Sequence, residues 1–334
     1  MRIDEDAWRQ LESEHHAAGI VTLRLFPSSP QDIFLAVEQP TGQRMLVIHV
    51  PNAAAEAQVR HGALPVTRGL TLRFTPAGPG RRDLQVILTA QDRREVFNPL
   101  VTDMAGVAAA AVGPAQALRA AVQRFEHWRH LLQSVADTGL DTPARRGLYG
   151  ELTILRTHLL PHLPADTAVD AWTGPTGSNQ DFQLESAAIE VKTGTAVAPQ
   201  NIVIANERQL DDTGVDRLLL AHLSIDERRG GSGESLNTVI DTIHTLLTGA
   251  AARATFDDLL TRVGYLPSQR HLYDEPRYTV RDTRFWHVAD GFPRITATDL
   301  PAGVGECRYR LSTVGLDHHR VPAEQVAQAV KGQT

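Results

Sequence analysis

The first hundred residues alternate between hydrophobic and polar positions with a period of two. This alternation is typical of strands with one buried face, and turn-forming residues separate its five short runs. The runs cover residues 21–25, 33–37, 45–49, 70–74 and 84–88. Because no helical pattern lies between them, the sequence predicts a small antiparallel barrel or sandwich. No acidic, basic or metal-ligating cluster appears here, so we expect a module that makes contacts.

Beyond residue 102 hydrophobic residues recur every three or four positions, as in amphipathic helices. Helices are predicted at about 115–135, from Thr142 to Pro161, at 235–247 and at 256–263. Strands are predicted at 181–184, 189–193, 202–205 and 217–225, and again between 278 and 314. The sequence therefore predicts a β-rich N-terminal domain (1–102) and an α/β domain (103–334) with a β-rich C-terminal extension.

A predicted hairpin, QDFQLESAAIEVKT at 180–193, carries the candidate chemistry. In its second strand Glu190 and Lys192 share a face, about 7 Å apart at Cα for a rise of about 3.3 Å per residue. A turn centred at 185–186 places Asp181 opposite Glu190, with side chains about 5 Å apart. Two carboxylates this close repel each other unless a cation lies between them. The pair therefore predicts a divalent metal held by oxygen ligands.

Glu151 supplies a third acidic side chain. It lies three residues after Leu148 and four before Leu155, at the edge of the apolar stripe of its predicted helix. A carboxylate turned toward a core costs free energy unless it is paired or bound to metal. A helix packed on the hairpin would bring Glu151 to the Asp181–Glu190 pair.

Lysine is almost absent, which draws attention to Lys192. Only Lys192 and Lys331 are lysines among 33 Lys+Arg. A GC-rich genome explains the excess of arginine, but arginine cannot act as a compact, titratable ammonium. The net charge of −6 argues against a protein that coats nucleic acid with a broadly basic surface, while leaving room for a local basic cleft.

The spacing of these residues resembles the signature of the PD-(D/E)XK nuclease superfamily, which has a restriction-endonuclease-like fold. Asp181 is followed after eight residues by Glu190-Val191-Lys192, and Glu151 precedes them on a helix. Three further segments are similar to a bacterial subfamily called PD-(D/E)XK motif proteins: GLYGEL at 147–152, NERQL at 206–210 and GFPRI at 291–295. Genes of that subfamily often accompany restriction or phage-defence genes, including ATPases and DNA methyltransferases. The resemblance extends over most of the chain.

The resemblance implies roles for five residues. Glu151, Asp181 and Glu190 would bind Mg²⁺, for which Mn²⁺ can substitute. Lys192 would position or activate the attacking water, and Gln209 would be the supporting polar residue on the helix after the hairpin. The residue before Asp181 is glutamine in this chain, whereas the motif has proline, which is commonly lost in the superfamily.

The function implied is metal-dependent cleavage of DNA by the nuclease subunit of a restriction or phage-defence system. The alternative is a catalytically silent subunit that binds DNA or assembles with ATPase or methyltransferase partners. Cutting both strands with this fold usually takes two active sites, which a homodimer would supply.

The sequence gives little support for a disulfide framework, a zinc site, a phosphate-binding loop or a membrane span. A single cysteine, Cys307, rules out a disulfide framework and a multi-cysteine zinc site. RRGGSGES at 228–235 joins a strand to a helix but lacks the GK[ST] ending of a phosphate-binding loop. With no apolar run long enough to cross a bilayer and no secretory signal, we expect a cytoplasmic protein without membrane contact.

Overall fold

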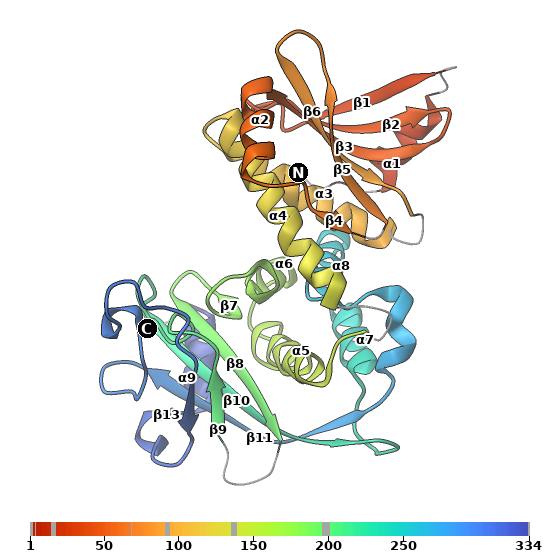
Figure 1. Ribbon diagram of the computed structural model, residues 1–334. Coiled ribbons are helices and arrows are strands. Elements are labelled where there is room, and N and C mark those ends of the chain that lie inside the picture. Colours follow the sequence, from red (N-terminus) through yellow and green to blue (C-terminus); the bar gives the residue numbers. More distant parts are fainter. Residues whose placement is uncertain are drawn as a thin grey trace. The chain divides into compact units, whose positions relative to one another are not determined.

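The computed structural model describes residues 3, 5–14, 18–67, 69–90, 94–134, 139–195 and 201–332. The chain forms two compact units, Met1–Ala136 and Asp137–Thr334. In Figure 1 the first unit runs from red to yellow and the second from green to blue. The sequence analysis placed the boundary at residue 102. The first unit extends past that residue and includes the helices Arg94–Ala109 and Pro114–Ser134.

The first unit contains one six-stranded antiparallel sheet, in the order β1-β2-β3-β6-β5-β4. Its strands are β1 (Gly19–Leu25), β2 (Ile33–Gln39), β3 (Gln43–Pro51), β4 (Val66–Thr67), β5 (Leu70–Pro76) and β6 (Arg81–Leu88). The five predicted strands are present, and β4 is a sixth. Within the described residues β1 and β4 do not pair with each other, so the sheet is open and is neither the predicted barrel nor a sandwich.

Four helices accompany this sheet, although the sequence predicted no helix among its strands. They are α1 (Glu5–Ser13), α2 (Asn52–His61), α3 (Arg94–Ala109) and α4 (Pro114–Ser134). Only α4 was predicted, at nearly these bounds. α1 is too short for a visible helical period, yet it buries Trp8 and Leu11. Arg44 of β3 holds α1 in place through ion pairs with Glu5 at 2.7 Å and Glu12 at 2.8 Å.

The second unit contains a mixed five-stranded sheet, in the order β13-β11-β10-β8-β7. Its strands are β7 (Phe182–Gln183), β8 (Ala187–Thr195), β10 (Arg217–Arg228), β11 (Arg277–Val288) and β13 (Arg320–Val321). β8 and β10 are parallel, and the other neighbours are antiparallel. A separate two-stranded ribbon joins β9 (Asn201–Ile204) to β12 (Tyr309–Ser312). The predicted central mixed sheet is therefore confirmed.

Helices flank the sheet of the second unit. They are α5 (Thr142–Ile154), α6 (Ala165–Asp170), α7 (Leu236–Leu246), α8 (Ala250–Arg262) and α9 (Ala323–Val330). A π-helical turn, η2 (Leu155–Leu159), extends α5, and four 3₁₀ turns follow: η3 (Gly174–Thr176), η4 (Pro267–Tyr273), η5 (Ala297–Asp299) and η6 (Asp317–His319). No helix in the described parts of the chain is both long and apolar enough to traverse a lipid bilayer.

Capping residues set the start of two of these helices. Ser235 caps α7 by accepting a hydrogen bond from Thr238 N at 3.1 Å. Asp141 caps α5 by accepting from Ala144 N at 2.8 Å. Both helices therefore begin directly after a residue whose side-chain oxygen satisfies a free backbone N–H group.

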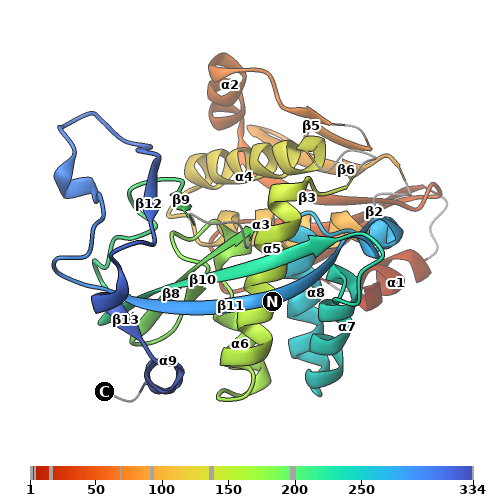
Figure 2. The ribbon, with the colours of Figure 1, turned by 90° about the horizontal axis from the view of Figure 1, so that it is seen from below.

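The sheet of the second unit packs on both faces. α5 packs on β8, and Figure 2 shows α5 crossing the long strands. The β9–β12 ribbon contributes Ile202, Ile204 and Leu311 to a core that also contains Ala188 and Trp286 of the sheet. β8 therefore lies between a helix and a ribbon, where side chains from both can approach it.

Candidate active site

The predicted hairpin places two carboxylates opposite each other. Phe182 of β7 pairs with Ile189 of β8, so Asp181 falls opposite Glu190 in the register that the sequence predicts. Asp181 lies one residue before β7, and its Oδ2 accepts a hydrogen bond from the backbone N–H of Val191 at 2.7 Å. This bond fixes the Asp181 carboxylate against the edge of β8.

Glu190 is a buried carboxylate whose charged neighbour is Lys192. Its side chain is 1% exposed, and neither carboxylate oxygen has a hydrogen-bond partner among the described residues. Lys192 Nζ lies 2.6 Å from Glu190 Oε1 and forms an ion pair with it. The contact places the two side chains on one face of β8, as predicted. Since buried polar groups are nearly always bonded, Glu190 is the group here that most needs another ligand.

Gln209 fixes the ammonium of Lys192. Its Oε1 accepts hydrogen bonds from Lys192 Nζ at 3.0 Å and from the backbone N–H of Ala205 at 2.7 Å. Gln209 lies in a turn between β9 and β10, whereas the resemblance implied a helix. The turn-forming residues 211–214, Asp-Asp-Thr-Gly, end that segment before a helix can extend.

Glu151 enters from α5 and borders the same space as Asp181. The indole N–H of Trp172 donates to Glu151 Oε2 at 2.8 Å. A Cβ atom added to Gly174 would lie 3.0 Å from Asp181 Oδ1 and 3.5 Å from Glu151 Oε2. Both carboxylates therefore face one small volume, which stays open because Gly174 has no side chain.

A second glycine sets the approach of α5 to β8. A Cβ atom on Gly150 would lie 1.9 Å from Thr193 Oγ1, far inside van der Waals contact. Only glycine at this position lets the helix come so near to the strand. Because Gly150 precedes Glu151 directly, this close contact also determines where the Glu151 carboxylate lies.

The electrostatics of the cluster disfavour three charged carboxylates. Burial, reinforced by Asp181, raises the pKa of Glu190 to about 8 against the opposing effect of Lys192. Burial and then the charge of Asp181 hold the pKa of Glu151 well above its usual value. Burial also raises the pKa of Asp181, although Lys192 and the N–H of Val191 act in the opposite direction. A cation bound among the carboxylates would relieve this repulsion.

These residues fit a hard divalent cation in an open site. Within the described residues no group of three or more His, Cys, Asp or Glu side chains is placed to hold a metal ion. A cation such as Mg²⁺ needs only one or two carboxylates, because water and substrate oxygens complete its shell. Asp181 and Glu190, opposite each other in the hairpin, would supply that pair, and Glu151 lies near Asp181.

Comparison with known families decides what kind of fold carries this site. A family model described as "Putative PD-(D/E)XK family member, (DUF4420)" matches residues 5–313. The chain belongs to this family. PD-(D/E)XK proteins are generally nucleases that use divalent metals, so the fold and the acidic cluster are nuclease-like. Comparisons with curated proteins and with solved structures gave no match.

Gln180 occupies the proline position of the family motif and connects the hairpin to the turn that contains Gln209. It is 5% exposed, and its Nε2 donates to the carbonyl oxygens of Arg208 at 3.1 Å and Asp211 at 3.2 Å. Its Oε1 accepts from Gln183 Nε2 at 3.3 Å. Gln180 therefore ties the hairpin to the turn that presents Gln209 to Lys192, which proline could not do.

Sequence reasoning missed this role of Gln180 and two other residues of the site. It took Gln180 only as a departure from the motif and gave Trp172 and Gly174 no role. Trp172 lies 21 residues from the Glu151 carboxylate that it contacts, so no local spacing could connect them. The one signal for Gln180 in the sequence is its position between Asn179 and Asp181, two residue types that favour turns.

Proposed function

We propose that this protein is a Mg²⁺-dependent DNA endonuclease that acts as the nuclease subunit of a bacterial restriction or phage-defence system. The observation that carries the proposal is the juxtaposition of two carboxylates and one ammonium: the buried Glu190 lies opposite Asp181 in the hairpin, and Lys192 Nζ lies 2.6 Å from Glu190 Oε1. Membership of the PD-(D/E)XK family supports the nuclease chemistry. The resemblance to defence-linked proteins supports the context, with an ATPase and a DNA methyltransferase as partners.

Asp181 and Glu190 would hold Mg²⁺, with Mn²⁺ as a substitute, and Glu151 would complete the carboxylate set. A bound divalent ion supplies positive charge that stabilises the phosphate oxygens as negative charge develops on them. The chain keeps these ligands in place beforehand. Val191 N–H fixes Asp181, and the Trp172 indole fixes Glu151.

Lys192 would act on the attacking water and on the scissile phosphate. Its ammonium can donate hydrogen bonds to the water oxygen and to phosphate oxygens, and so stabilise charge that appears only in the transition state. The Lys192 ammonium is held between Glu190 Oε1 and Gln209 Oε1, 2.6 Å from the first and 3.0 Å from the second. With 19% of the side chain exposed, Lys192 still reaches the open side of the site.

The decisive experiment is cleavage of plasmid and phage DNA by the full chain, alone and with the proposed ATPase and DNA methyltransferase partners. Reactions should contain Mg²⁺, Mn²⁺ or Ca²⁺, with EDTA as a control. We expect cleavage with the first two ions and binding without cleavage in Ca²⁺. No cleavage with partners present, together with no effect of Mn²⁺ on thermal unfolding, would refute the proposal and leave the silent assembly subunit.

Metal-free stability and metal affinity should respond to pH in opposite directions. Unfolded Glu190 loses its proton near its usual pKa of 4.5, whereas the folded protein holds it up to a pKa of about 8. The contribution of Glu190 to the stability of the metal-free fold should therefore be fully present below the lower value and be lost as pH rises through the upper one. Because Glu190 must release that proton to bind a cation, Mn²⁺ affinity should rise over the same interval.

Calorimetric titration with Mn²⁺ measures this linkage. Near neutral pH, two buffers with different protonation enthalpies should give different apparent binding heats, and the difference should shrink above the pKa of Glu190. Glu190→Gln should remove most of the proton release. An Mn²⁺ affinity that stays constant from about pH 6 to 9 would contradict the proton-holding role of Glu190.

Gln180→Ala should slow cleavage without weakening the metal site. Loss of the amide frees the turn at Arg208 and Asp211, so Gln209 no longer holds Lys192 firmly. Changes to residues that orient active groups commonly cost about tenfold to a hundredfold, and we expect a fall in kcat of that size. The rise in Tm caused by Mn²⁺ should remain.

The matched control is Gln183→Ala, which removes one hydrogen bond to Gln180 but leaves both bonds to the turn. Its cleavage rate should stay close to that of the unmodified protein. If Gln180→Ala lowers Mn²⁺ affinity as much as it lowers kcat, Gln180 supports the metal ligands and not Lys192.

A further inference from the structure

The outer edge of β11 is open over the middle of the strand. β10 pairs with β11 along its inner side, from Arg277 to Val288. On the outer side, within the described residues, Glu234 bridges to Tyr278 and β13 pairs with Phe285 and Trp286. Between these two contacts no described strand covers residues 279–284. Unpaired backbone N–H and C=O groups of this kind can accept another strand.

Two adjoining cavities follow this open edge. One has a volume of about 520 Å³ and is bordered by Thr283, Phe285 and β13. The other has a volume of about 570 Å³ and is bordered by residues 278–280 and by α5. His158 and Thr283 line both cavities, so they form one groove, which we call the edge groove.

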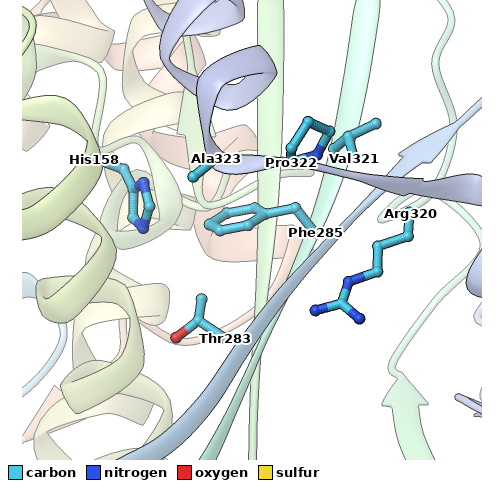
Figure 3. Close-up of a pocket in the computed structure, with 7 residues that line it drawn as sticks. All are labelled: His158, Thr283, Phe285, Arg320, Val321, Pro322 and Ala323. Carbon is cyan, nitrogen blue, oxygen red and sulfur yellow. The ribbon is translucent and has the colours of Figure 1, made fainter.

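The helical wall of the edge groove has an unusual local structure. His158 lies in the π-helical turn η2, where Leu160 N bonds to Leu155 O at 3.0 Å, five residues back. Such turns are rare and occur frequently at functional sites. The His158 ring meets Phe285 edge-on, with centroids 4.8 Å apart. Figure 3 shows the His158 ring beside the Phe285 ring, and the Arg320 side chain on the other side of Phe285 from His158.

The charge of the edge groove favours an acidic ligand. Arg320 is the one ionised side chain on the cavity beside Phe285, because burial lowers the pKa of His158. Within the described residues Arg320 is exposed and makes no ion pair. At the other cavity Arg156 is already neutralised by Glu234 at 2.6 Å. The uncompensated positive charge therefore lies at the end of the groove near β13.

We propose that the edge groove binds an extended, acidic peptide segment of a partner protein. The segment would add to β11 as a strand beside residues 279–284, about 20 Å at about 3.3 Å per residue. A carboxylate of the segment would bind the Arg320 guanidinium, and its apolar side chains would fill the cavity at Phe285. Arg281 is the extra residue of a bulge in β11, since Ser224 pairs with Asp282 and Ile225 with Val280, and it forms an ion pair with Asp226. A charged bulge discourages unselective pairing at this edge, so the cavities determine which segment binds.

The test is a selection of random twelve-residue displayed peptides on the full chain, with counter-selection on Arg320→Glu. We expect enriched peptides to alternate apolar and polar residues and to carry Asp or Glu. A synthetic copy of the leading peptide should protect from hydrogen exchange those amides between residues 279 and 284 that face the outer edge of β11. Methylating its backbone nitrogens one at a time should weaken binding at every second position, because one edge of a strand faces β11.

Arg320→Gln should weaken the leading peptide about tenfold or more, since hydrogen bonds to a charged group are among the strong ones. The matched control is Arg310→Gln, which removes an exposed arginine of β12 and should leave binding unchanged. Both variants should keep the response to Mn²⁺. A selection without enrichment, peptides that bind Arg320→Glu equally well, or protection away from β11 would each overturn the proposal.

Discussion

We expect Glu190→Gln and Lys192→Ala each to lower the rate of DNA cleavage at least about a hundredfold, or about 3 kcal/mol of transition-state stabilisation. The two variants should nevertheless fail differently. Glu190→Gln keeps the side-chain shape but removes a negative ligand, so metal affinity falls. Lys192→Ala leaves the carboxylates intact and removes only the cation that acts on the attacking water. Raising Mg²⁺ should partly rescue the first variant and not the second.

Thermal unfolding separates the two failures independently of cleavage. A ligand that binds only the folded state raises Tm according to its concentration relative to Kd. Mn²⁺ should therefore raise the Tm of Lys192→Ala as it does in the unmodified protein, but should have little effect on Glu190→Gln. The metal response of Lys192→Ala could even increase, because the ammonium 2.6 Å from Glu190 Oε1 competes with a metal ion.

The chain offers close controls for both changes. Lys331→Ala removes the other lysine, which is exposed, and Glu185→Gln neutralises an exposed glutamate in the turn of the same hairpin. Both should cleave at the normal rate. If the unmodified protein, Glu190→Gln and Lys192→Ala protect equally against phage at matched protein levels, the site is a relic and the protein works by binding.

The hairpin of the site could be predicted because its geometry is local. A short turn and period-two alternation fix the register of two adjacent strands, so the residues from 180 to 193 were enough to place Asp181 opposite Glu190. The shared face of Glu190 and Lys192 follows from the same alternation. Glu151 was found by a different signal, namely a carboxylate at the edge of an apolar helical stripe.

The remaining contacts of the site depend on long-range packing that no spacing reveals. Gln180 reaches the carbonyl oxygen of Asp211, 31 residues away, through a turn whose path is set by the β9–β12 ribbon. Long-range packing also explains why the fold of the first unit was only partly predicted. Its strands were visible, but their order joins β3 to β6 across α2 and two intervening strands. α1 has only nine residues, too few for its helical period to stand out.

Gly150→Ala should destabilise the second unit and displace Glu151. The added Cβ would lie 1.9 Å from Thr193 Oγ1 and 3.2 Å from Thr193 Cβ. Relief requires α5 to move away from β8 or Thr193 to rotate, and such overpacking typically costs about 1–3 kcal/mol. Because Glu151 follows directly, cleavage should fall even where the protein remains folded. Thermal unfolding of the full chain measures the first effect, and hydrogen exchange within α5 assigns it to this helix.

Gly147→Ala is the matched control, because Gly147 lies in the same helix. Its Cβ would meet only Glu151 Oε1, at 4.0 Å, so the better helix propensity of alanine should stabilise α5 by up to about 1 kcal/mol.

Thr193→Ala removes the hydroxyl that clashes with the Cβ at position 150, and combined with Gly150→Ala it should restore much of the loss. A favourable coupling of about 1–3 kcal/mol in this double-mutant cycle would identify the helix–strand contact as the cause. If the two changes add without coupling, the need for glycine at 150 arises elsewhere, and the close approach of α5 to β8 does not determine the position of Glu151.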